Sequence, residues 1–111
     1  MITTHILDTS LGLPASDVLA KLEKKHTDHG WQMIGEAKTN SDGRIADFGI
    51  QPEQISAGEF RLTFYVDSYF LSSKRDSFYP EIQVLFKTKD SQHYHVPLLL
   101  NPYGYSTYRG S

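Results

Sequence analysis

Residues 59–66 read Glu-Phe-Arg-Leu-Thr-Phe-Tyr-Val, and large apolar side chains alternate in this stretch with polar or amphipathic ones. Successive side chains of a β-strand point to opposite faces, so the stretch predicts a strand with one buried face and one exposed face. Residues 81–87, Glu-Ile-Gln-Val-Leu-Phe-Lys, repeat the alternation. Two half-buried strands of this kind indicate a protein whose core is covered by β-sheet.

Further strands are predicted on either side of this pair. Short apolar stretches bounded by turn-forming residues indicate strands over residues 3–8, 31–38, 44–48, 94–100 and 103–108, and residues 67–73 predict one short helix. Residues 16–25 are ambiguous, because a capping serine and good helix formers favour a helix while alternate apolar residues from Val18 fit a strand. We expect a strand, since tertiary context overrides helix propensity over so short a window. The pattern as a whole favours an all-β sandwich.

Length and composition indicate one domain over residues 1–111. A chain of this length with 39% hydrophobic residues can bury one modest core. The net charge of -2 argues against a nucleic-acid partner, which would need a basic face. No stretch approaches the roughly 20 apolar residues that cross a bilayer. The N-terminal residues show no secretory pattern, so we expect a cytoplasmic protein without a membrane partner.

The predicted strand over residues 94–100 has two apolar faces. One face carries Tyr94, Val96, Leu98 and Leu100, and the other carries His95, Pro97 and Leu99. If the first face packs on the core, the second needs another cover, and a second copy of the same chain is the simplest one. His95 would then lie in a buried surface where an imidazole can do acid–base chemistry. A structural histidine satisfied by a hydrogen bond is nevertheless the commoner case.

Other polar groups are candidates for the same site. His5 lies in a strand among small or apolar neighbours, and Arg44 follows the turn at residues 41–43. A guanidinium can hold an anionic or carbonyl-rich substrate through paired hydrogen bonds, although most turn arginines are only solvated. Residues 108–111, Tyr-Arg-Gly-Ser, combine polar groups that we expect to be held in a site. Without a Gly-x-Ser-x-Gly turn, Ser111 is poorly suited to be a nucleophile, which favours activation of water.

A metal site is an alternative. His93 and His95 are two residues apart on one strand, a spacing that can chelate zinc. The chain has no cysteine, and no third ligand stands at a diagnostic spacing, so we predict no metal. Zinc binding by His93, His95 and His5 stays open as a second hypothesis. His26 and His29 lie in a polar stretch and are expected to be solvated.

Four segments together resemble the 5-hydroxyisourate hydrolase family, the transthyretin-like proteins of urate catabolism. They are Thr-His-Ile-Leu-Asp-Thr at 4–9 with Gly-Leu-Pro-Ala at 12–15, Gly-Arg-Ile at 43–45, Tyr-His-Val-Pro-Leu-Leu-Leu at 94–100, and Pro-Tyr-Gly-Tyr-Ser-Thr-Tyr-Arg-Gly-Ser at 102–111. The resemblance implies a transthyretin-like β-sandwich of two four-stranded sheets with one short helix. It also implies a homotetramer, a dimer of dimers with its active sites at the dimer–dimer interface.

The resemblance further implies a reaction and its residues. His5, Arg44, His95 and Ser111 would be the catalytic set, and Tyr108 and Arg109 would join His5 and Arg44 in binding the substrate. The small-molecule substrate would be 5-hydroxyisourate, opened at its C6–N1 amide to 2-oxo-4-hydroxy-4-carboxy-5-ureidoimidazoline without a cofactor. Either histidine could activate water. The alternative function is a transthyretin-like carrier of a small ligand without catalysis, which fold alone does not separate from the hydrolase.

Overall fold

The alternating stretch near residue 60 forms the centre of one sheet. In the computed structural model, which describes residues 1–28 and 30–111, β6 (Gly58–Phe64) pairs antiparallel with β3 (Leu19–His26) and with β7 (Ile82–Thr88). β4 (Gly30–Lys38) pairs with β3, which gives the order β4-β3-β6-β7. The two half-buried strands predicted from the alternation are therefore confirmed, and the structure shows that they are neighbours.

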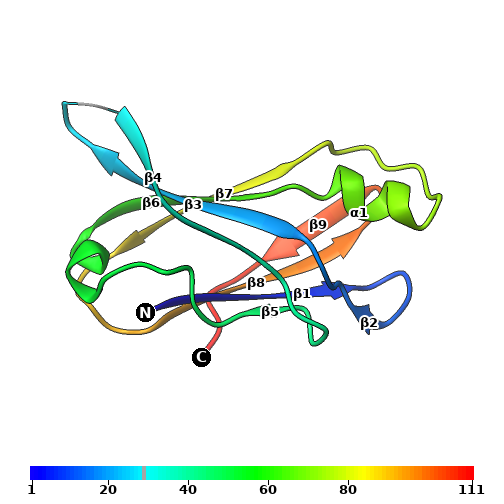
Figure 1. Ribbon diagram of the computed structural model, residues 1–111, viewed down its shortest axis with the longest axis horizontal. Coiled ribbons are helices and arrows are strands. Elements are labelled where there is room, and N and C mark those ends of the chain that lie inside the picture. The colour runs from blue at the N-terminus through cyan, green and yellow to red at the C-terminus, as the bar shows by residue number, and fades with distance from the viewer. Residues whose placement is uncertain (29) are drawn as a thin grey trace.

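The second sheet is built on two parallel strands. β1 (Ile2–Asp8) and β8 (Tyr94–Asn101) pair over seven positions, from Ile2 with Tyr94 to Asp8 with Leu100. β9 (Gly104–Thr107) adds antiparallel to β8, while the two-residue strands β2 (Leu13–Pro14) and β5 (Arg44–Ile45) both pair with β1. Figure 1 shows this sheet facing the first one, so the predicted transthyretin-like sandwich is confirmed, with five strands in this sheet when β5 is counted.

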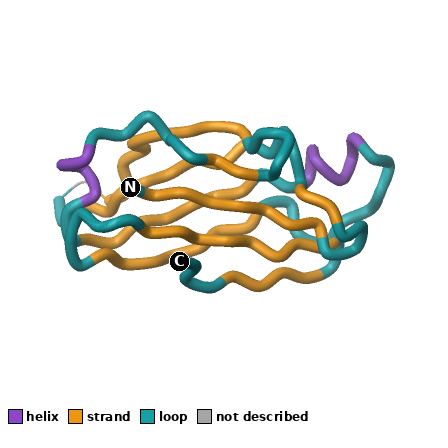
Figure 2. Tube along the Cα trace, turned by 90° about the horizontal axis from the view of Figure 1, so that it is seen from below, coloured by secondary structure: helices purple, strands orange, loops and turns teal. Residues whose placement is uncertain are grey.

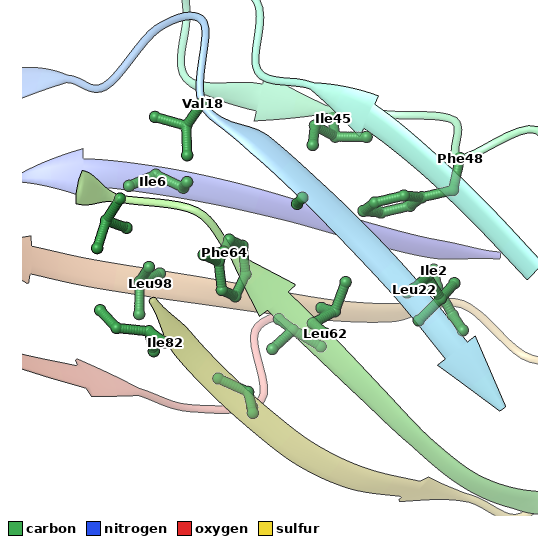
Figure 3. Packing of buried hydrophobic residues seen from close by; sticks show 14 of the residues in the cluster. Ile2, Ile6, Val18, Leu22, Ile45, Phe48, Leu62, Phe64, Ile82 and Leu98 are labelled. Carbon is green, nitrogen blue, oxygen red and sulfur yellow. The ribbon is translucent and has the colours of Figure 1, made fainter. Parts of the chain in front are cut away.

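The core lies between the two sheets. Phe60, Leu62 and Phe64, alternate residues of β6, are fully buried in one cluster with Ile6 and Leu98 of the second sheet, and Figure 3 shows Phe64 near Leu98. The helix α1 (Asp67–Ser72) and the 3-10 helix η1 (Pro52–Ile55) lie at the two ends of the sandwich in Figure 2. Within the described residues, no helix combines the length and apolar character needed to cross a membrane.

The ambiguous stretch at residues 16–25 is a strand. β3 begins at Leu19 and pairs on both of its edges, with β4 and with β6. Two rows of backbone hydrogen bonds and a buried face outweigh the helix propensity of this segment. The short helix predicted at residues 67–73 is confirmed as α1.

The strand predicted at residues 44–48 is wrong beyond Ile45. Asp47 Oδ1 accepts a hydrogen bond from the backbone N–H of Gly49 at 2.7 Å, and Gly49 has a φ of +77°. An aspartate that bonds two residues ahead, followed by a left-handed glycine, turns the chain away from the edge of β1. β2 and η1 were not predicted at all, since each is too short to show a period.

A buried carboxylate joins β1 to the segment that follows α1. Asp8 has no exposed surface, and its carboxylate accepts hydrogen bonds from Arg75 Nη2 at 2.8 Å, Tyr69 Oη at 2.8 Å and Ser10 Oγ at 2.6 Å. Burial raises the pKa of Asp8, but these hydrogen bonds and the charge of Arg75 outweigh burial and lower the pKa to about 2. Asp8 is therefore ionised at neutral pH and paired with Arg75.

We expect Asp8→Asn to lower the free energy of unfolding by about 3 kcal/mol at pH 7, because it leaves Arg75 without its buried counter-ion. Since folding lowers the pKa of Asp8, its contribution is complete above the usual value of 3.8 and is lost as the pH falls towards 2. Urea unfolding at pH 7 and pH 3, at one protein concentration, measures the difference. The exposed Asp42→Asn is the control and should change stability by no more than about 0.5 kcal/mol. An equal loss for Asp8→Asn at both pH values would contradict the assignment.

Candidate active site

A tight turn places Arg44 against β1. Asn40 Oδ1 accepts the backbone N–H of Arg44 at 3.0 Å, and Gly43 has a φ of +73°. A Cβ at Gly43 would lie 2.5 Å from the carbonyl oxygen of Ile6, so only glycine fits this close approach. The turn therefore fixes β5 on β1, where Arg44 is paired with His5.

The parallel pairing of β1 with β8 places a hydroxyl beside two imidazoles. Thr3 is paired with His95, and Thr3 Oγ1 lies 2.7 Å from His95 Nδ1 and 2.9 Å from His93 Nε2. Thr3 is buried, His95 is half-buried and His93 is exposed. Residues that are paired in register share a face of a sheet. Thr3, His5, Arg44 and His95 thus all lie on the outer face of the second sheet, as the alternation of residues 94–100 predicted for His95.

The C-terminal residues return along β8 to His95. Thr107 is paired with Leu98, and the isolated pair of Gly110 with His95 continues the same register three residues further along each strand. The N–H of Gly110 donates to the carbonyl oxygen of His95 at 2.8 Å. A Cβ at Gly110 would lie 2.6 Å from His95 Cδ2, so glycine lets the chain pass directly against the imidazole.

These elements enclose a hollow of about 200 Å³ on the outer face. It is lined by Thr3, Thr4, Arg44, Ile45, Ala46, His93, His95 and Ser111. Three of the four residues predicted to be catalytic, Arg44, His95 and Ser111, therefore meet at one hollow. The fourth, His5, does not line it but is paired with Arg44.

The two other predicted residues lie in a neighbouring pocket. Tyr108 and Arg109 line a second pocket, of about 320 Å³, which shares His95 with the hollow. The guanidinium of Arg109 stands 4.7 Å from the ring centre of Tyr94, whose side chain packs in the core. Within one chain, Tyr108 and Arg109 thus lie on one side of His95, and Arg44 lies on another side.

Comparison with known proteins identifies the family of this chain. Residues 2–110 match the HIUase/Transthyretin family. The chain belongs to this family. A 5-hydroxyisourate hydrolase from Salmonella dublin is 48% identical over 100% of this chain and 81% of that protein. The structure of the 5-hydroxyisourate hydrolase from Klebsiella pneumoniae has a TM-score of 0.86 and 36% identity over 99% of this chain and 98% of that chain. The transthyretin of sea bream, in complex with thyroxine, has a TM-score of 0.91 and 31% identity over 98% of this chain and 93% of that chain.

The charges around this hollow favour a neutral imidazole at His95. Burial lowers the pKa of His95, and the positive charges of Arg44, His93 and His5 lower it further. At neutral pH His95 is therefore mostly unprotonated and able to accept a proton.

Sequence reasoning missed the role of Thr3. It noted no contact between Thr3 and the histidines, because parallel pairing of segments some 90 residues apart leaves no local signal.

The prediction that His26 is solvated is wrong, since it is half-buried at the paired end of β3. His29 lies outside the described residues. Zinc binding would require three ligands to converge, and no group of three His, Cys, Asp or Glu in the described part of the chain is placed to hold a metal ion.

The close approach of Gly110 makes a testable prediction. We expect Gly110→Ala to push residues 109–111 away from β8, because the new Cβ would meet His95 Cδ2 at 2.6 Å. The imidazole resonances of His95 in an NMR spectrum should shift while the far-ultraviolet circular dichroism stays unchanged. Gly104→Ala is the matched control, because its Cβ would meet no atom nearer than 3.8 Å. Unchanged His95 resonances in Gly110→Ala would show that the tail does not touch the imidazole.

Proposed function

We propose that this protein hydrolyses 5-hydroxyisourate, opening the six-membered ring at the C6–N1 amide to give 2-oxo-4-hydroxy-4-carboxy-5-ureidoimidazoline. The observation that carries the proposal is the convergence of a half-buried imidazole, that of His95, with Arg44 and Ser111 around one hollow. The relatives from Salmonella dublin and Klebsiella pneumoniae, both named 5-hydroxyisourate hydrolase, support the choice of substrate.

In the proposed reaction His95 is the general base. It takes a proton from a water molecule as the water oxygen attacks C6 of the substrate, which gives a tetrahedral intermediate and an imidazolium. The C6–N1 bond then breaks, and the imidazolium returns the proton to N1. C6 is then a carboxylic acid, which loses its proton to solvent and leaves the site as a carboxylate. An imidazole with a lowered pKa suits this exchange, because it is neutral before the attack and releases the proton readily afterwards.

Arg44 stabilises the negative charge that grows on the C6 oxygen. Its guanidinium presents several N–H donors in a plane, which suits the carbonyl groups of a flat substrate. Ser111 supplies a hydroxyl beside the hollow. His5, paired with Arg44, helps to hold the substrate on the opposite side from the tail. Tyr108 and Arg109 complete the pocket next to His95.

We also propose that the chain assembles as a homotetramer, a dimer of dimers. The site lies on the outer face of the second sheet, and none of the described elements covers this face in Figure 1. Leu7 and Leu99, paired beside the site, are half-buried in the single chain. A second copy packed on this face would exclude water from them and would narrow the hollow around the substrate.

The decay of freshly prepared 5-hydroxyisourate, followed by ultraviolet absorbance, tests the proposed function. We expect the protein to accelerate the decay, His95→Asn to lower kcat by about 10²- to 10⁴-fold, and Arg44→Met to lower it by about 10²- to 10³-fold. Lys38→Met is the control, because Lys38 is exposed on β4 of the other sheet and should not affect the rate. Sedimentation shows whether the variants keep the same assembly. A decay rate unaffected by the protein would contradict the enzyme and favour the alternative of a small-ligand carrier, which equilibrium dialysis can then test.

The pH dependence of kcat/KM tests the base separately. Because the folded protein lowers the pKa of His95 from its usual 6.5, His95 stays neutral down to below that pH. We expect kcat/KM to be flat at neutral pH and to fall only below pH 6.5, as His95 becomes protonated. This acid limb should be absent in the residual activity of His95→Asn. A limb with its midpoint above 6.5, or one that persists in His95→Asn, would assign the base to another group.

A further inference from the structure

The buried hydroxyl of Thr3 bridges two imidazoles, that of His95 on β8 and that of His93, the residue just before β8. Thr3 Oγ1 lies within hydrogen-bond distance of His95 Nδ1 and of His93 Nε2, and Thr3 is 8% exposed. The backbone register of β1 with β8 sets this contact, because Thr3 is the paired neighbour of His95. The two rings lie 6.4 Å apart and are inclined by 82°, so they do not stack, and the hydroxyl is the link between them.

The bridge couples the proton positions of the two histidines. A hydroxyl has one proton, so Thr3 can donate to only one of the two ring nitrogens and must accept from an N–H of the other. If Thr3 donates to His95 Nδ1, the proton of neutral His95 lies on Nε2, which then has no lone pair for water. If Thr3 donates to His93 Nε2 instead, Thr3 accepts the Nδ1–H of His95, and His95 Nε2 is free to act as a base.

We propose that Thr3 and His93 are positioning residues that hold His95 with Nδ1 protonated and Nε2 bare. The inference rests on the proposed hydrolysis, in which His95 takes a proton from water. His93 is exposed, so water can bond its Nδ1–H, and this arrangement leaves no buried donor without an acceptor. When His95 Nε2 takes the proton from water, the Nδ1–H bond to Thr3 stays in place. The bridge therefore orients the ring both before and after the proton transfer.

Substitutions at Thr3 separate the hydroxyl from the shape of the side chain. Thr3→Val keeps the branched shape but removes the acceptor for His95 Nδ1–H, so both tautomers of His95 become populated. We expect kcat to fall by about 10- to 100-fold with little change in KM, as when a group that orients a functional histidine is removed. Thr3→Ser keeps the hydroxyl and should retain most of the activity.

His93 provides an independent pair of variants at an exposed position, which tests the inference even if Thr3→Val fails to fold. His93→Phe removes the acceptor of the Thr3 proton, so Thr3 can turn its proton towards His95 Nδ1. His93→Gln keeps a side-chain acceptor near the position of Nε2. We expect kcat to fall in His93→Phe and to be largely retained in His93→Gln.

Nitrogen-15 NMR of the imidazoles reads the tautomers without substrate. In the unsubstituted protein near pH 7.5 we expect His95 to show a protonated Nδ1 and a bare Nε2, and we expect Thr3→Val to add the opposite tautomer. A protonated Nε2 on His95 in the unsubstituted protein, or an unchanged kcat in both Thr3→Val and His93→Phe, would overturn the inference. Failure of the proposed function appears differently, as a protein that does not accelerate the decay of 5-hydroxyisourate whatever tautomer His95 adopts.

Discussion

The parallel pairing of β1 with β8 is the constraint on which the site depends. It joins the first strand of the chain to one that begins more than 90 residues later, and its seven paired positions leave no freedom to slide. A shift by one residue would turn Ile2 and Ile6 out of the core and would carry Thr3 away from His95. The same hydrophobic contacts that close the sandwich therefore also place the functional groups on its outer face.

Each edge of this strand pair receives one further part of the site. On the β1 edge, the Gly43 turn brings Arg44 beside His5, and on the β8 edge the C-terminal residues bring Gly110 against His95. Both approaches require glycine, because a Cβ at either position would meet its neighbour within 2.6 Å. The site is thus assembled from four segments, namely β1, the turn before Arg44, β8 and the C-terminal residues, and the rigid pair of β1 and β8 sets the spacing of the other two.

The sequence predicted the strands and the outward direction of His95, because both follow from a period of two in the side chains. It also predicted Arg44 and Ser111 as partners of His95, through the resemblance of separate segments to one family. The sequence did not predict the contacts between these segments, because the pairing of distant strands leaves no local pattern. Thr3 was missed because a threonine alone does not indicate a functional site. The end of β5 at Ile45 was also missed. The side chain of Asp47 forms a turn with Gly49, and this turn ends the strand despite the apolar residues around it.

Similarity of fold does not distinguish a hydrolase from a carrier in this family. The sea bream transthyretin superimposes on this chain with a higher TM-score than the Klebsiella pneumoniae hydrolase, although the hydrolase is more similar in sequence. The difference in function must therefore lie in a few side chains on a shared backbone. In this chain the candidates are a half-buried imidazole, a guanidinium and a hydroxyl that line one hollow. A carrier needs an apolar surface that fits its ligand, whereas this hollow brings a half-buried imidazole together with an exposed guanidinium and an exposed hydroxyl, a combination typical of catalytic sites.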